Sequence, residues 1–241
     1  MENTSILKAQ SPAALAEEYI VKSIWNNHFP PGSDLPAERE LAERIGVTRT
    51  TLREVLQRLA REGWLSIQHG KPTRVNYIWE TAGPNIIGTI IKLDKNYLPV
   101  VISNVVSLRT RMAEAYIPEA VKLAPEESAK LFDGLDNLEN TAVAYAEFDY
   151  KLFRQFTFLA NKPVYALILN SFKSMYHQVA KIFFNDPDNR QLTLNFYRSL
   201  QAACIAKDSE KATACMAKSR QSSGEIWKKL SANIPENFGE L

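Results

Sequence analysis

The alternation of apolar and polar positions predicts three short helices before residue 62. The first follows Ser11 and Pro12, a capping residue and a proline suited to a first helical turn. Its apolar stripe consists of Leu15, Tyr19, Ile20 and Ile24. The second starts near Ala37 and ends at Gly46, because glycine readily adopts the left-handed conformation that closes a helix. The third runs from Thr48, a capping residue, to about Arg61.

The third helix has two distinct faces, and the period of the pattern changes after it. One face is apolar, with Leu52, Val55, Leu56 and Leu59, and the other carries Arg49, Thr50, Arg53 and Gln57. After Gly63, alternating residues predict a strand through Trp64, Leu65 and Ile67, a tight turn at 69–72 and a returning strand at 73–75. This order of elements predicts a helix-turn-helix followed by a β-hairpin wing.

The rest of the chain reads as helical. Residues 77–84 form a connector that contains Gly83 and Pro84, and proline residues punctuate the helical spacing beyond it. The predicted helices cover 85–93, 99–121, 125–139, 142–160, 163–184, 188–206 and 208–231. We therefore expect a mostly α protein: a winged helix-turn-helix domain at 1–76, a linker at 77–84 and an all-α helical bundle at 85–241.

Composition adds little to this picture, but the position of the charges adds more. With 45% apolar and 23% charged residues the chain has ordinary globular values, and without a membrane span or a signal peptide it is expected in the cytoplasm. The net charge is only +2, so total charge does not indicate DNA binding. Arginines nevertheless crowd the segment from 44 to 61, where Glu54 is the only acid. Cys204 and Cys215 lack the companions of a disulfide framework or a zinc site.

The start of the third helix carries groups suited to DNA. Arginine can fork onto a guanine edge in the major groove, and the hydroxyls of Thr48, Thr50 and Thr51 suit phosphates or thymine methyl groups. A basic amphipathic helix can also be merely a solvated helix. The string LPAERELAERIGVTRTTLREVLQRLAREGWLSIQHGKPTRV at 35–75, however, resembles the GntR family of bacterial regulators throughout its winged helix-turn-helix.

That resemblance implies roles for individual residues. The operator-contacting positions of the family match Arg39, Arg49, Thr50, Thr51 and Arg53, and its minor-groove wing tip matches His69, Gly70 and Lys71. The chemistry agrees, since glycine allows close backbone approach and lysine offers charge to a phosphate. The alternative for His69 is a plain turn residue. Arg44, Arg58 and Arg61 are assigned to phosphates, salt bridges or subunit contacts.

Polar residues interrupt the apolar stripes of the helical domain. Arg109 lies on the stripe of Ile102, Val105, Met112 and Tyr116, and Asp149 lies on the stripe of Tyr145, Leu152 and Phe156. Buried charges need partners, so one interpretation is a polar core network and the other is a ligand site in which Arg109 meets an anionic group. Aromatic residues at helical spacing form either core or a pocket wall: Phe153, Phe172, Tyr176 and Phe183.

The last predicted helix loses bulk before Trp227. Ser219, Ser222, Ser223 and Gly224 fall in its interior, where glycine costs about 1 kcal/mol relative to alanine. We expect something to pack closely there, either another helix or a ligand chain lying over Ser223 against the indole.

Over its full length the chain resembles the branch of the GntR family that regulates fatty-acid metabolism. Segments that carry this likeness include KAQSPA, EEYI, SIWNN, HFPPG, IQHGKPT, FDYKLFR, LILNSFK and SSGEIW. The resemblance implies a homodimer formed through the DNA-binding domains and a helical domain that binds long-chain acyl-CoA, which releases the protein from operator DNA. It implies repression of fatty-acid degradation genes and activation of synthesis genes. The implied ligand residues are Arg109, Phe153, Tyr176, Ser223 and Trp227, with Arg220 and Phe183 replacing a family glycine and tyrosine.

Two other classes of protein fit the sequence less well. Related regulators bind a metal and a small carboxylic acid through an aspartate and histidines, but Phe153 stands four residues after Asp149, and His177 is the only histidine of the helical domain. An acyl-thioester hydrolase would need a nucleophile motif, and none is present. We expect neither an enzyme nor a metal or cofactor site, with acyl-CoA as an effector only.

Overall fold

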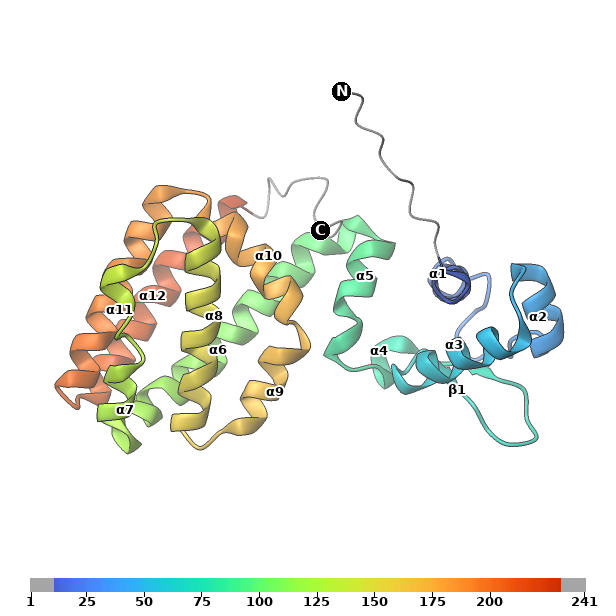
Figure 1. The fold of residues 1–241 in the computed structure, drawn as a ribbon, viewed down its shortest axis with the longest axis horizontal. Coiled ribbons are helices and arrows are strands. Elements are labelled where there is room, and N and C mark those ends of the chain that lie inside the picture. The colour runs from blue at the N-terminus through green and yellow to red at the C-terminus, as the bar shows by residue number, and fades with distance from the viewer. Residues whose placement is uncertain (1–10, 231–241) are drawn as a thin grey trace, which may run out of the picture. The chain divides into compact units, whose positions relative to one another are not determined.

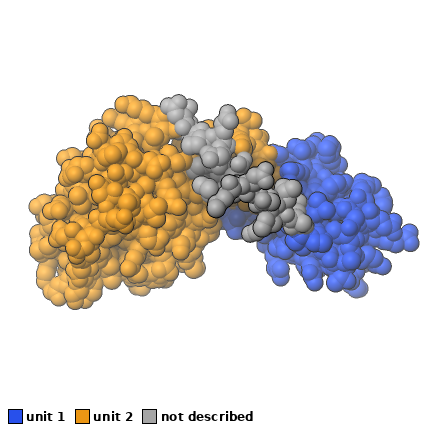
Figure 2. Space-filling model, turned by 45° about the horizontal axis from the view of Figure 1, so that its top comes forward, with its two compact units in different colours: residues 1–86 blue, residues 87–241 orange. Residues whose placement is uncertain are grey.

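The computed structural model describes residues 11–230, which fold into two compact units (Figures 1 and 2). The first unit comprises residues 1–86 and the second residues 87–241. The outer ends of the two predicted domains, 1–10 and 231–241, lie outside the described residues.

Three helices form the body of the first unit: α1 (Pro12–Trp25), α2 (Glu38–Ile45) and α3 (Arg49–Arg61). The predicted helix ends are confirmed, with Ser11 and Thr48 as N-caps and Gly46 closing α2 at a φ of 82°. The predicted apolar stripe of α1 needs one correction. Leu15 is 44% exposed, and the buried face runs through Ala16, Ile20 and Ile24 instead.

A short hairpin follows α3. Strands β1 (Leu65–Ser66) and β2 (Arg74–Val75) pair antiparallel, with Leu65 opposite Val75. The extended segment before α2 continues this pairing, because the Val75 N–H donates to the Ser33 carbonyl at 2.8 Å and the Leu35 N–H to the Thr73 carbonyl at 2.8 Å. The hairpin therefore leaves the helical body from a fixed base, as a wing.

The segment expected to be a connector is ordered and packs on the end of α3. It contains α4 (Ile78–Thr81) and a 3₁₀ turn at Pro84–Ile86. The Gly63 carbonyl accepts hydrogen bonds from Asn76 Nδ2 at 3.0 Å and from Thr81 Oγ1 at 2.7 Å. Gly63 has a φ of 94°, and a Cβ there would lie 2.6 Å from the Thr81 carbonyl oxygen. Only glycine fits this close approach of two backbones.

The second unit is helical throughout its described residues, as predicted. Its elements are α5 (Ile87–Leu93), η2 (Lys95–Tyr97), α6 (Leu98–Leu123), α7 (Pro125–Lys130), η3 (Leu135–Asn137), α8 (Ala142–Leu159), α9 (Pro163–Ser171), α10 (Lys173–Phe184), α11 (Pro187–Ile205) and α12 (Ser209–Leu230). Several prolines that punctuate the pattern occupy first helical turns, where their missing N–H costs nothing.

Two predicted helices of this unit are wrong in extent. The segment 163–184 is two helices separated at Phe172, whose φ of −121° interrupts the helix while its ring is buried. The segment 125–139 is only α7, a turn and the 3₁₀ turn η3. The core of the unit lies where α6, α8, α10, α11 and α12 pack, around fully buried rings such as Tyr116, Phe156 and Tyr197. No helix within 11–230 is long and apolar enough to span a membrane.

Candidate nucleic-acid interface and effector pocket

The helix α3 buries one face and exposes the other, as the sequence predicts. Leu52, Val55, Leu56 and Leu59 are buried against the unit, while Arg49, Thr50, Arg53 and Gln57 are exposed. Because α1 and α2 both pack against the buried face of α3, they fix the position of its exposed face. Such a helix, preceded by a tight turn, has the dimensions to enter the major groove of DNA.

The hydroxyl groups at the start of α3 are partly engaged in capping it. Thr48 Oγ1 accepts a hydrogen bond from the Thr51 N–H at 3.1 Å and lies 2.9 Å from Thr51 Oγ1. This contact satisfies a backbone donor that the first turn leaves unpaired. Thr50 lies between them and is exposed, with no such contact to another described residue. The Thr50 hydroxyl, which takes no part in this cap, is thus available for phosphate contact.

The arginines predicted to read bases differ in their contacts. Arg39 and Arg49 are exposed and pair with no other side chain in the described part of the chain. Arg53, in contrast, donates from Nη2 to Glu38 Oε2 at 2.7 Å. This carboxylate raises the pKa of Arg53 above its ordinary value. Glu38 was not among the candidate residues, because sequence spacing does not show that α2 and α3 bring these two side chains together.

The more distal arginines are engaged within the protein. Arg58 pairs with Glu17 of α1, and Arg44 Nη2 donates to Glu40 Oε1 at 2.8 Å along α2. Both contacts are salt bridges, one of the three roles expected for these arginines.

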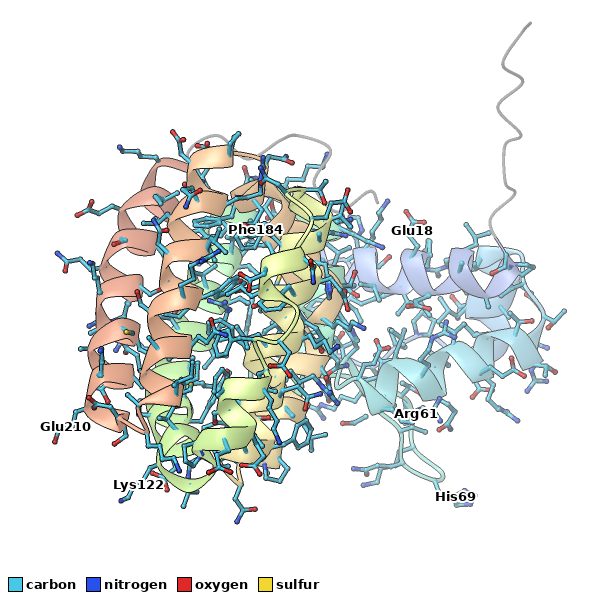
Figure 3. The ribbon with its side chains drawn as sticks, turned by 60° about the vertical axis from the view of Figure 1, so that its left-hand side comes forward. Glu18, Arg61, His69, Lys122, Phe184 and Glu210 are labelled. Atoms are coloured by element: carbon cyan, nitrogen blue, oxygen red, sulfur yellow. The ribbon has the colours of Figure 1, made fainter. Side chains whose placement is uncertain are left out.

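The wing ends in a tight turn at the predicted residues. The Lys71 N–H donates to the Gln68 carbonyl at 3.2 Å, and Gly70 adopts a φ of 72°. His69, Gly70 and Lys71 are all exposed, and His69 lies at the tip of the loop (Figure 3). Nothing lies within 4 Å of a Cβ built at Gly70, so the tip is open for a flat approach by a nucleic-acid backbone.

The second unit contains a pocket between α6, α8, α10, α11 and α12. All five residues predicted to bind a ligand line it: Arg109, Phe153, Tyr176, Ser223 and Trp227. The rest of the wall includes Val105, Val179, Phe184, Thr193 and Phe196. The structure brings the predicted residues together from four helices, and their role toward a ligand stays a prediction.

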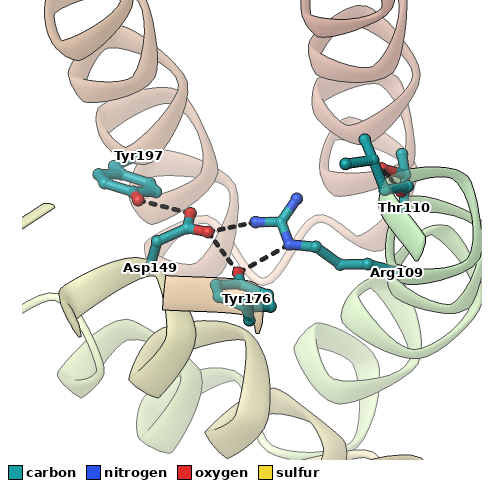
Figure 4. A network of polar contacts seen from close by, with 6 residues as sticks. Arg109, Thr110, Asp149, Tyr176 and Tyr197 are labelled. Carbon is teal, nitrogen blue, oxygen red and sulfur yellow. Dashed lines mark hydrogen bonds and ion pairs between the residues drawn. The ribbon is translucent and has the colours of Figure 1, made fainter. Parts of the chain in front are cut away.

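Arg109, Asp149 and Tyr176 line the pocket and belong to a buried polar network (Figure 4). Arg109 pairs with Asp149, and its Nε donates to the Tyr176 hydroxyl at 2.7 Å. Tyr176 in turn donates to Asp149 Oδ2, and Tyr197 donates to Asp149 Oδ1 at 2.6 Å. The predicted polar core network is therefore present, and Tyr197 is the member that the sequence did not single out.

The network fixes the protonation of its members. Burial raises the pKa of the Tyr176 and Tyr197 hydroxyls, so both remain donors. Burial alone would lower the pKa of Arg109, but the Asp149 carboxylate and the adjacent tyrosines raise it overall. Side-chain exposure is 21% for Arg109 and 8% for Asp149, so the arginine is the member that still reaches open space.

Aromatic rings surround this charge. The Arg109 guanidinium carbon lies 3.7 Å from the centroid of the Phe153 ring, and Phe183 stacks on Trp227 with centroids 5.5 Å apart. Phe172, predicted as part of the aromatic wall, does not line the pocket and is instead buried between α9 and α10. The pocket is thus polar at one side, where the Arg109–Asp149 ion pair lies, and aromatic at the other.

A groove between α6 and α12 adjoins this pocket. The pocket has a volume of about 80 Å³ and the groove about 430 Å³, and both are lined by Val106, Thr110, Ser223 and Trp227. Arg220, which replaces a family glycine, lies at the groove and bonds through Nε to Glu114 Oε1 at 2.5 Å. No atom of the described residues lies within 4 Å of a Cβ built at Gly224, so no other helix packs closely there, and the alternative of a ligand chain stays a prediction. The small residues open the groove.

Within 11–230 no three potential metal ligands gather, and the geometry supports two other roles. An exposed helix with a wing, together with a helical unit that contains a mixed polar and apolar pocket, is the arrangement of a winged-helix transcription regulator with a second domain that has room for a small ligand. Residues 12–75 match the family model "Bacterial regulatory proteins, gntR family", and residues 76–239 match the model "FadR C-terminal domain". The chain belongs to the fatty acid metabolism regulator proteins of the GntR family.

Individual relatives agree over nearly the whole chain. It is 56% identical to the fatty acid metabolism regulator protein of Haemophilus influenzae over 99% of both chains, and 56% identical to that of Pasteurella multocida over 98% of both. The solved structure of Lar, described as controlling the Listeria monocytogenes agr system, shares the fold at a TM-score of 0.53 and 16% identity, over 93% of this chain and 97% of Lar. The protein is a DNA-binding transcription regulator of this family and not an enzyme.

Proposed function

We propose that the protein binds operator DNA as a homodimer in the cytoplasm, represses genes of fatty-acid degradation, activates genes of fatty-acid synthesis, and leaves DNA when long-chain acyl-CoA binds. The observation that carries the proposal is that the five residues implied by the family resemblance surround a single pocket. The curated relatives are described as regulators of fatty acid metabolism.

On the DNA side, base reading is assigned to Arg39, Arg49 and Arg53, and phosphate contact to the threonines of α3 and to the wing. Arginine donors can engage the two acceptors of a guanine edge, whereas lysine offers one point charge to the phosphates. A homodimer presents two such units to half-sites about one helical turn apart. Tyr77, the N-cap of α4, and Trp79, on α4, are largely exposed and supply apolar surface for the subunit contact.

On the ligand side, the pocket matches an amphiphile in chemistry. Arg109 offers a cation to a polar or anionic group, and Phe153, Phe183 and Phe196 supply wall for an apolar chain. The present volume of about 80 Å³ is smaller than the several hundred Å³ of a usual ligand site. We infer that the ligand enters through the adjoining groove and separates α12 from α6, with Ser223 and Trp227 lining both spaces.

This inferred movement supplies the coupling that a regulator needs. A ligand shifts the protein away from DNA only when it binds the released state more tightly than the DNA-bound state. Separation of α12 from α6 changes the arrangement of helices in the second unit. The segment 77–86 transmits this change to α3 of each subunit. The Gly63 contacts with Asn76 and Thr81 tie this segment to the end of α3.

The release step is tested by a gel-shift titration at fixed salt. Long-chain acyl-CoA is expected to weaken operator binding at least tenfold, which corresponds to a coupling free energy of about 1.4 kcal/mol or more. Free CoA and an acyl-CoA of short chain are expected to have little effect, because they leave the aromatic wall unfilled. Operator affinity that does not change at saturating long-chain acyl-CoA rules out the effector assignment.

A matched pair of variants separates the pocket from the DNA site. Trp227→Ala is expected to weaken acyl-CoA binding in calorimetry while leaving operator affinity intact, because Trp227 lines both pocket and groove in the second unit. The control Leu123→Ala changes an exposed apolar residue of the same unit that lines neither space. Equal ligand affinity in the two variants contradicts the site.

The division of labour on the DNA side gives another expected result. Arg49→Ala should cost roughly 1–3 kcal/mol of operator affinity and relax the preference at one base pair. Lys71→Ala should weaken operator and random DNA alike and reduce the salt dependence by about one charge. Fluorescence anisotropy with both duplexes at several salt concentrations measures these effects. An equal loss on both duplexes for Arg49→Ala contradicts base reading by this residue.

A further inference from the structure

One of the three candidate base-reading arginines is held by an acid, and the other two are not. Arg53, on the second turn of α3, is 63% exposed and donates from Nε and Nη2 to the carboxylate of Glu38, at 3.2 and 2.7 Å from Oε2. Glu38 is the first residue of α2 and is 32% exposed. The contact spans 15 positions of sequence and joins the two helices of the DNA-binding motif.

The position of Glu38 favours a lasting contact. Glu38 occupies the first turn of α2, and the N-terminus of a helix favours a negative charge there. Arg53 extends to it from a helix that is fixed by its buried face. A planar guanidinium carries five N–H donors. The contact with Glu38 uses Nε and Nη2 on one edge, and Nη1 makes no hydrogen bond to another described residue.

The contact has two consequences for DNA. A carboxylate beside Arg53 compensates its charge, which weakens the attraction of this cation to any phosphate. The same contact fixes the plane of the guanidinium, which limits the directions in which its remaining donors can point. Both effects weaken binding to DNA of random sequence. The fixed plane of the guanidinium also favours a hydrogen bond to a base edge at one position in the groove.

We propose that Glu38 is a specificity-determining residue of this regulator: it restrains Arg53 from random phosphates and orients the arginine toward a base edge in the operator. The inference rests on the base-reading role proposed above for Arg53. Glu38 acts here as a positioning residue, through Arg53, and needs no contact with DNA of its own.

The test uses the full-length protein with two duplexes, one that the wild type selects from a randomised pool and one of scrambled sequence. Glu38→Gln keeps the shape of the side chain but removes its charge. We expect this variant to bind the scrambled duplex roughly tenfold more tightly, with a salt slope more negative by about 0.9, the value of one added phosphate contact. Discrimination between the duplexes then falls roughly tenfold.

Glu40→Gln is the matched control. Glu40 lies on the same helix, pairs with Arg44 within one turn at 2.8 Å, and its replacement changes the net charge by the same amount. Discrimination by this variant should stay within about twofold of the wild type, since screened exposed charges act weakly at a distance. An equal effect of the two substitutions assigns the result to general charge and overturns the proposal.

A double-mutant cycle adds a second criterion. In an Arg53→Ala background, Glu38→Gln should leave discrimination unchanged, because the residue through which Glu38 acts is gone. A loss of discrimination that persists there, or an equal loss of affinity for both duplexes together with a lowered thermal midpoint, overturns the proposal. Failure of the wild type to select any sequence contradicts the proposed base reading itself, which is a different result from selection that Glu38→Gln does not alter.

Discussion

Replacing Asp149 with alanine is expected to lower the free energy of unfolding of the helical unit by about 3–5 kcal/mol, the usual cost of removing one partner from a buried ion pair. The substitution leaves Arg109 without its counter-charge and removes the acceptor for the Tyr176 and Tyr197 hydroxyls. Urea denaturation followed by far-ultraviolet circular dichroism measures the loss. The variant should also bind acyl-CoA differently, because the same network forms a wall of the pocket.

The matched control for this result is Asp136→Ala. Asp136 pairs with Arg198 at 3.4 Å in the same unit, but the two side chains are 86% and 60% exposed. An exposed pair of this kind contributes about 0–1 kcal/mol, so little change is expected. If Asp149→Ala and Asp136→Ala lower the free energy of unfolding by similar amounts, the buried network does not stabilise the unit more than an exposed ion pair does.

Replacing Gly63 with alanine is expected to be almost as costly for the DNA-binding unit. A left-handed backbone costs a non-glycine residue about 1–2 kcal/mol, and forcing an extra methyl into a packed site adds about 1–3 kcal/mol. Here the methyl carbon would lie 2.6 Å from the Thr81 carbonyl oxygen and 2.7 Å from the Ala82 Cα. Thermal unfolding monitored through buried Trp64, which follows Gly63 directly, reports the change.

Gly46→Ala separates the two contributions. Gly46 has a φ of 82°, close to that of Gly63, but nothing lies within 4 Å of the position that an added methyl group would occupy. It should therefore lose only the backbone contribution of about 1–2 kcal/mol. A Gly63→Ala variant no less stable than Gly46→Ala would contradict the close contact between the end of α3 and the segment that follows β2.

The sequence predicts the DNA-binding unit closely because its signals are local. A cap at Thr48, a left-handed glycine at 46 and a change of period after Gly63 each depend on a few neighbouring residues, and each lies where predicted. The exposed and buried faces of α3 follow from the same periodicity. The arginines of that face could therefore be named as candidates before any contact was known.

The wrong predictions concern features that depend on contacts between segments far apart in the sequence. The pattern across 163–184 is continuously helical, yet the backbone leaves the helical conformation at Phe172, whose ring packs in the core, and two helices result. A closely packed helix was one of the two alternatives for Gly224, but this residue lines the groove, since helical spacing does not reveal how far apart two helices stand. The sequence pattern does not reveal the contact of Tyr197 with Asp149, because it depends on the packing of α11 against α8. The contact of Glu38 with Arg53 depends in the same way on the packing of α2 against α3.

The two hydrogen bonds to the Gly63 carbonyl also bear on the design of chimeric regulators. The boundary between the two matched family regions suggests joining a foreign sensor domain directly after residue 75. A junction there would remove Asn76 and Thr81, whose side chains satisfy that carbonyl, and with them the helix α4 that covers the end of α3. A transplantable DNA-reading module of this protein therefore extends to residue 86, where the first compact unit ends.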